Sequence, residues 1–196
     1  MEKNKIELKL YLSIILFFLF ITSLSVSLYY QISFIYTLLT MILSIMLIII
    51  VDAVSATICR LLPIFFANFN LKIFKVTKKE KRFYEFLKIK KWKELIPEIG
   101  HFTGFRKNRI SEPNNINYIK RFLHEICYGE IGHFVSMFLG ILIIFIPWFN
   151  PIWTPICIVT IIVNAILNLL PIFVLRYNSY TLSIIYNRLK RKNTNQ

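Results

Sequence analysis

The chain has 196 residues and a mass of 23.3 kDa, which is enough for one domain. Hydrophobic residues make up 56% of the chain, a larger fraction than in typical soluble domains, and its mean hydropathy is +0.59. We therefore do not expect a water-soluble globular protein. Lys and Arg exceed Asp and Glu by 14. In a membrane protein this excess indicates contact with lipid headgroups, and we do not expect nucleic acid as a partner.

Two long stretches, residues 10–51 and 131–175, contain no Lys, Arg, Asp or Glu. A helix needs about 20 apolar residues to cross a hydrocarbon core of ~30 Å, so each stretch is long enough for two crossings joined by a short turn. The sequence therefore predicts an all-α integral membrane protein with four transmembrane helices, arranged as two helical hairpins. The predicted spans lie at about residues 10–29, 33–51, 133–148 and 153–175.

The turns predicted inside the two hairpins carry aromatic and proline residues, which are typical of a bilayer interface. The first turn is marked by Tyr29, Tyr30 and Gln31, and the second by Pro147, Trp148, Phe149, Asn150, Pro151 and Trp153. Neither turn contains Lys or Arg, and positive charge stays on the cytoplasmic side of short loops. We therefore expect a single multi-pass domain (1–196) in the cell membrane, with both termini and the interfacial segment 59–129 on the cytoplasmic side.

The middle segment combines many basic residues with large apolar ones. Within residues 78–96, apolar side chains recur at helical spacing on one side, at Phe86, Ile89, Trp92 and Ile96. This pattern predicts a basic interfacial helix that lies on anionic lipid and ends near Pro97. A second interpretation stays open, in which the lysines also concentrate an anionic substrate that carries phosphates.

A further helix is predicted to begin near Ile116 and to run into the third span. On it, Glu130 and His133 are three residues apart and share a face, whereas Glu125 lies on a different side. His133 can act as a general base, with Glu130 orienting its ring and stabilising its charged form. The alternative is that His133 only marks the membrane surface and Glu130 ends the cytoplasmic helix. A metal site is not expected, because the spans supply no further carboxylates.

The fourth span contains Asn164, Asn168 and Pro171. Proline removes a backbone donor, so we expect a bend where Asn168 either satisfies the backbone, binds a polar group, or makes an interhelical hydrogen bond. Arg176 follows the span and can bind a phosphate or simply supply a positive charge at the boundary. Cys127 suggests an acyl-enzyme, but a buried or palmitoylated thiol fits its surroundings better.

Three blocks of the sequence are distinctive together. They are residues 89–98 (IKKWKELIPE), residues 125–134 with Glu130-Ile131-Gly132-His133, and residues 168–178, from Asn168-Leu169-Leu170-Pro171 to Arg176-Tyr177-Asn178. In order and spacing they resemble the glycosyl-4,4'-diaponeurosporenoate acyltransferase family, small multi-span enzymes of staphyloxanthin-type carotenoid synthesis. The likeness extends over about residues 60–182, and the chain differs from the family at Phe134, Leu175, Ser179 and Thr181.

The resemblance implies transfer of a fatty acyl group from acyl-CoA, as co-substrate, to a sugar hydroxyl of a glycosylated polyisoprenoid or related glycolipid. The partners would then be membrane lipid, the acyl donor and a lipid-like acceptor, with no bound cofactor and no metal. By matching position, it implies catalytic roles for His133 and Glu130. The implied substrate-binding residues are Trp92, Glu125, Asn168, Arg176, Tyr177 and Asn178.

A different class of protein remains compatible with the same pattern. Four spans and a basic cytoplasmic surface also occur in non-catalytic small membrane proteins, such as an immunity factor or a subunit of a transporter or assembly. The position of the gene beside lipid synthesis genes, or beside a transporter operon, would separate the two interpretations.

Overall fold

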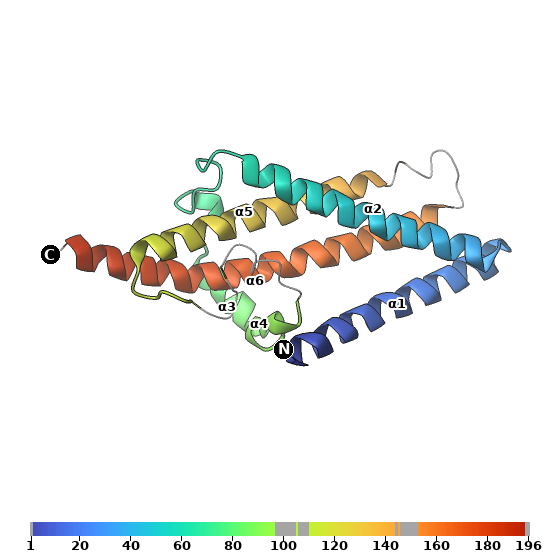
Figure 1. Ribbon diagram of the computed structural model, residues 1–196, viewed down its shortest axis with the longest axis horizontal. Coiled ribbons are helices and arrows are strands. Elements are labelled where there is room, and N and C mark those ends of the chain that lie inside the picture. Colours follow the sequence, from blue (N-terminus) through green and yellow to red (C-terminus); the bar gives the residue numbers. More distant parts are fainter. Residues whose placement is uncertain (1, 97–104, 106–109, 144, 146–152, 195–196) are drawn as a thin grey trace. The chain divides into compact units, whose positions relative to one another are not determined.

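The computed structural model describes residues 2–96, 105, 110–143, 145 and 153–194 (Figure 1). All regular elements in this part of the chain are helical, which confirms the predicted all-α class. The number of transmembrane helices and their orientation stay predictions. The elements are α1 (Glu2–Tyr30), α2 (Phe34–Leu61), η1 (Lys72–Phe74), α3 (Lys78–Phe86), α4 (Ile89–Trp92), η2 (Lys93–Leu95), α5 (Ile116–Ile141) and α6 (Thr154–Thr194), where η marks a 3₁₀ helix.

The chain divides into two compact units, which share the long helices α2, α5 and α6. The first unit consists of Met1–Ser55 and Val135–Leu169, and the second of Ala56–Phe134 and Leu170–Gln196. Residues 147–152 of the predicted second turn, with the end of the predicted third span, lie outside the described residues. The break predicted at Pro97 also lies outside them.

In the first unit, α1 and α2 form an antiparallel hairpin, as predicted (Figure 1). Helix α1 ends because Gln31 adopts a left-handed conformation with φ 53°, and the amide of Ile32 then donates to the carbonyl of Ser27 at 3.2 Å. Across the hairpin, the buried hydroxyl of Thr37 donates to the carbonyl of Ser23 at 3.1 Å.

The first unit encloses several polar side chains beside a small apolar cluster and exposes many large apolar ones. Phe17, Leu28 and Ile35 are at least 60% exposed, whereas Thr40 and Ser44 are buried and their hydroxyls donate to backbone carbonyls. This is the reverse of a water-soluble fold, and a hydrocarbon solvent favours it because polar groups there must be satisfied within the protein. Among the described residues, two helices, α2 and α6, are long and apolar enough to cross a bilayer.

The second unit has a conventional apolar core between the first half of α5 and the second half of α6. Helix α5 begins at Ile116, as predicted, because the side chain of Asn115 accepts from the amides of Asn117 and Tyr118 at 3.0 and 3.2 Å. The core packs side chains of both helices against the loop that follows α2. Its buried members are Ala67, Phe69, Phe74, Phe105, Ile119, Phe122, Leu123, Ile126, Cys127, Leu182 and Leu189.

The single helix predicted over residues 78–96 is wrong. Helix α3 ends at Phe86, and Lys88 adopts a left-handed conformation with φ 54° before the short helix α4 begins. The break turns the following residues, so Ile89 is fully buried while Phe86 is 80% exposed. The two residues therefore do not share a face, and α3 is a separate nine-residue helix.

The approach of α5 to α6 in the first unit generates a stability prediction. A Cβ atom on Gly140 would overlap Nδ2 of Asn164, whose amide donates to the carbonyls of Ser136 and Met137. We expect Gly140→Ala to destabilise the protein by about 1 to 3 kcal/mol, because the buried amide must move. Thermal unfolding in detergent measures the loss.

Gly132→Ala is the matched control on the same helix. A Cβ atom there would lie 3.7 Å from Cα of Ala56, which is ordinary van der Waals contact. Equal losses of stability for the two variants would contradict the close approach of Gly140 to Asn164.

Candidate active site

The site begins at the amino-terminal end of α3. Thr77 precedes the helix and its hydroxyl accepts from the amide of Glu80 at 3.1 Å, which fixes the first turn. Glu80 is the only acidic residue of that turn. The Thr-x-x-Glu spacing is that of a capping box, and the cap fixes where the Glu80 side chain leaves the helix.

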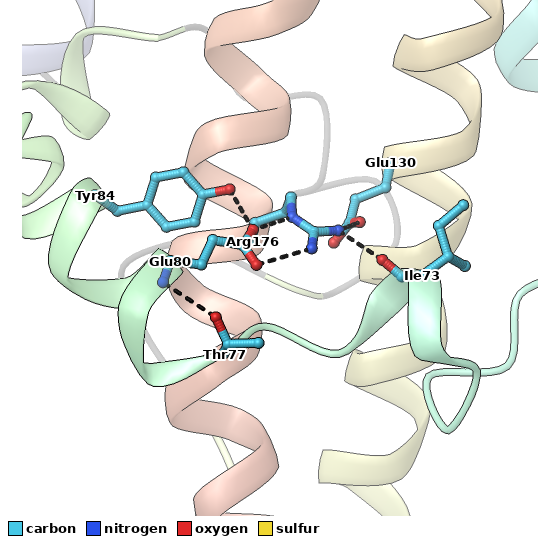
Figure 2. A network of polar contacts seen from close by, with 6 residues as sticks. All are labelled: Ile73, Thr77, Glu80, Tyr84, Glu130 and Arg176. Atoms are coloured by element: carbon cyan, nitrogen blue, oxygen red, sulfur yellow. Dashed lines mark hydrogen bonds and ion pairs between the residues drawn. The ribbon is translucent and has the colours of Figure 1, made fainter.

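Arg176 on α6 joins three elements of the second unit (Figure 2). Its Nε and Nη2 atoms donate to the two carboxylate oxygens of Glu80 at 2.5 and 3.2 Å. Its Nη1 atom donates both to Oε2 of Glu130 on α5 at 2.8 Å and to the carbonyl of Ile73 in η1 at 3.0 Å. The guanidinium therefore lies between two carboxylates that are 50 residues apart in the sequence.

Glu80 has the better partners of the two carboxylates. Besides the two bonds from Arg176, its Oε1 atom accepts from the hydroxyl of Tyr84, one helical turn further along α3, at 2.6 Å. Burial alone would raise the pKa of Glu80, but the hydrogen bonds from Arg176 and Tyr84 outweigh it and hold the pKa below its usual value. Glu80 is therefore ionised at neutral pH.

Glu130 is the more buried carboxyl and has fewer partners. It is 6% exposed, and its Oε1 atom is buried with no hydrogen-bond partner. Burial raises its pKa to about 7, against the lowering effect of Arg176 and with a smaller contribution from the nearby Glu80. Glu130 therefore gains or loses its proton near neutral pH, unlike Glu80.

His133 lies one turn after Glu130 on α5, as predicted, and its side chain is partly buried. Side chains three residues apart on a helix are neighbours, with Cβ atoms about 5 to 6 Å apart. Glu125, expected on a different side, interacts elsewhere: its Oε2 atom lies 3.6 Å from Nη2 of Arg60, which is half exposed. The helix thus keeps Glu125 apart from the Glu130 and Arg176 pair.

Tyr177 and Asn178 contact two lysines. The Lys81 ammonium lies 3.1 Å from the centre of the Tyr177 ring and donates to the carbonyl of the same residue at 3.3 Å. Lys93 donates to Oδ1 of Asn178 at 3.4 Å. Burial, together with the neighbouring Lys93, lowers the pKa of Lys81, although Glu85 acts in the opposite direction. These contacts attach α3 and η2 to α6.

Trp92 completes the packing of α3 and α4 on α6. Its indole Nε1 donates to the carbonyl of Leu87 at 2.9 Å, which closes the turn around Lys88. Its ring packs against a small cluster of buried side chains that includes Tyr84 and Val174. Trp92, one of the residues to which the sequence resemblance assigns substrate binding, therefore supports the segment that carries Glu80.

Asn168 belongs to the first unit and is fully buried there. Its amide donates to Oδ1 of Asn164 at 2.8 Å and to the carboxylate of Asp52 at 3.4 and 3.5 Å. Asn164 in turn donates to carbonyls of α5. Asn168 therefore forms the interhelical hydrogen bond that the sequence left open, to Asp52 of α2, and Asn164 forms a second one, to α5.

Cys127 is 2% exposed, and burial, with a contribution from Glu130, raises the pKa of its thiol. A neutral, enclosed thiol is a poor nucleophile, which agrees with the expected buried cysteine. In the described part of the chain, no group of three or more His, Cys, Asp or Glu side chains is placed to hold a metal ion.

The Arg176 cluster generates a second stability prediction. Arg176→Gln would leave two carboxylates without their positive partner, one of them in the protein interior. We expect a loss of about 3 kcal/mol in the free energy of unfolding, measured by thermal or chemical unfolding in detergent.

Arg60→Gln is the comparison, because Arg60 is 52% exposed and its pair with Glu125 is longer. We expect it to cost less than about 1 kcal/mol. A loss as large as that of Arg176→Gln would contradict the special role of the buried cluster.

A protein-family model matches the sequence of this chain. The family model for glycosyl-4,4'-diaponeurosporenoate acyltransferase matches residues 64–188, which include Glu80, Glu130, His133 and Arg176. No curated protein matches the chain, and no solved structure matches it. Since the family model covers more than half of the chain, the protein belongs to the glycosyl-4,4'-diaponeurosporenoate acyltransferase family.

Proposed function

We propose that the protein is a membrane acyltransferase that moves a fatty acyl group from acyl-CoA to a sugar hydroxyl of a glycosylated polyisoprenoid or related glycolipid. The family supports acyl transfer in carotenoid synthesis. The observation that carries the proposal is the buried Glu130, held through one oxygen by Arg176, with its other oxygen unpartnered one helical turn before His133. The Oε1 atom of this carboxyl can accept a hydrogen bond from a histidine or from a substrate.

Ester formation from a thioester requires a base for the attacking hydroxyl. In the proposed reaction, the neutral imidazole of His133 takes the proton of the sugar hydroxyl while the oxygen attacks the thioester carbonyl. The tetrahedral intermediate then collapses and the carbon–sulfur bond breaks. The imidazolium returns the proton to the departing CoA thiolate, so the reaction ends with an ester, a free thiol and a neutral histidine.

Glu130 orients His133 in this mechanism. Because Oε2 already accepts from Arg176, Oε1 is the oxygen left for the imidazole N–H. An ionised Glu130 stabilises the imidazolium that forms in the transition state. Arg176 donates through all three nitrogens to protein acceptors, so we assign it to holding Glu130 and not to binding phosphate.

The proposed binding of the acyl donor and of the acceptor is based on where the basic and apolar residues lie. The anionic head of acyl-CoA is attracted to the exposed basic residues of the second unit, among them Lys78, Lys79 and Lys90. Tyr177 is a proposed donor to the developing oxyanion or to the acceptor sugar. The amide of Asn168 already donates to Asn164 and Asp52, so we assign Asn168 to packing within the first unit. The acyl chain and the polyisoprenoid would enter from the lipid that surrounds the apolar helices, with both termini of the protein on the cytoplasmic side.

His133→Gln tests the base assignment. A glutamine side chain cannot accept a proton at neutral pH, so we expect acyl transfer by the purified protein in detergent to fall by about 10² to 10⁴. The assay measures free CoA thiol and, by mass spectrometry, the acylated glycolipid.

The matched control is His124→Gln on the same helix, because Nδ1 of His124 contacts the backbone carbonyl of Ala67 at 2.8 Å in the apolar core. We expect this variant to remain active when it is folded. Wild-type activity in His133→Gln would end the proposed base role.

Cys127→Ala tests whether the acyl group passes through the enzyme. Because the thiol is enclosed and neutral, we expect direct transfer, with activity retained in the variant. Intact-protein mass spectrometry after incubation with acyl-CoA alone should detect no added acyl mass. An acylated wild-type protein that loses the adduct in Cys127→Ala would contradict direct transfer.

A further inference from the structure

We propose that Glu80 is a positioning residue that neutralises Arg176 and thereby leaves Glu130 able to take up and release a proton beside His133. None of the three sequence blocks on which the family resemblance rests, residues 89–98, 125–134 and 168–178, includes Glu80. The inference rests on the proposed function for its catalytic meaning, but the charge arrangement itself can be measured without any acyl transfer.

The hydrogen bonds around Arg176 are divided unequally. Glu80 receives two of them, from Nε and Nη2, in a bidentate arrangement that also fixes the plane of the guanidinium. Glu130 receives one, from Nη1, which also donates to the carbonyl of Ile73. Glu80 is further stabilised by Tyr84 (Figure 2). The positive charge of Arg176 therefore interacts mainly with Glu80.

The charges around Glu130 determine whether its carboxyl is ionised. The charged or titratable groups around it are Arg176 from α6, Glu80 from α3, and the neutral Cys127 and His133 on its own helix. One guanidinium balances one carboxylate, so two ionised carboxylates would leave a net negative charge in the protein interior. The carboxyl with fewer hydrogen bonds and deeper burial holds the proton, and this is Glu130.

The consequence for the reaction is a proton that exchanges near the working pH. When Glu130 is protonated, it no longer stabilises an imidazolium at His133, so activity falls at acidic pH. Because the two groups are neighbours, the acidic limb of the pH profile belongs to the pair. Removing the negative charge of Glu80 exposes Glu130 to the full charge of Arg176, so Glu130 should lose its proton at lower pH.

The experiment is an infrared titration of the full-length protein in detergent. The band of the protonated Glu130 carboxyl is identified by its loss in Glu130→Gln, and its intensity is followed with pH. We expect a wild-type midpoint near neutral pH and a midpoint about one pH unit lower in Glu80→Gln, since a nearby charge shifts such groups by about 1 to 3 units. The acidic limb of the acyl transfer profile should move in the same direction.

Two controls separate charge from stability. Glu85→Gln removes the same charge from an exposed position of α3 and should leave the midpoint unchanged. Gly140→Ala in the first unit is destabilising but removes no charge, so it should lower the unfolding temperature without moving the midpoint. If Glu80→Gln fails to fold, Glu80→Asp, which keeps the charge, must retain the wild-type midpoint.

Each result decides the inference. A Glu80→Gln midpoint equal to that of the wild type or of Glu85→Gln overturns it, and so does a shifted midpoint in Glu80→Asp. If the band shifts as expected but no donor supports acyl transfer, the proposed function fails while the role of Glu80 in setting the Glu130 charge stands.

Discussion

The second unit depends on a single guanidinium placed between two carboxylates. Arg176 on α6 reaches Glu80 on α3 and Glu130 on α5, so one side chain connects three helices that are distant in the sequence. A lysine could not replace it, because an ammonium lacks the planar arrangement of donors that serves both oxygens of Glu80 and a third acceptor. Burying the guanidinium of Arg176 costs free energy, and its hydrogen bonds offset this cost only while all its acceptors remain in place.

The two units solve different packing problems. In the first, polar side chains such as Thr37 and Asn164 are buried and bonded to the backbone, while large apolar side chains are exposed. In the second, aromatic and aliphatic side chains such as Phe122 and Leu123 form an ordinary apolar core. The proposed transfer from a charged donor to a lipid acceptor would use both environments, one facing hydrocarbon and one stabilising ionised groups.

Much of the helical architecture could be predicted from the sequence. Long uncharged stretches identify α1, α2 and α6, and Asn115 marks the start of α5 because its side chain satisfies free backbone amides. The pairing of Glu130 with His133 on one helix follows from spacing alone. These features are local, so they depend on residues that are near one another in the chain.

The features that could not be predicted depend on distant residues or on a rare backbone conformation. Glu80 and Arg176 are separated by 96 positions, and nothing near either residue indicates the other. The one local signal, the Thr77 cap spacing, predicts a helix start but not a partner for Glu80. The break at Lys88 was missed because left-handed residues are usually Gly or Asn, and lysine gives no such indication.

The close contact of Gly140 with the Asn164 amide has an evolutionary consequence. The two positions cannot vary independently, because any side chain at 140 occupies the space of the amide at 164. A lineage that acquires alanine at 140 must displace the amide at 164, and that displacement weakens the hydrogen bonds from Asn164 to α5. The two positions are therefore coupled by geometry, and relatives that kept the asparagine are expected to have kept the glycine.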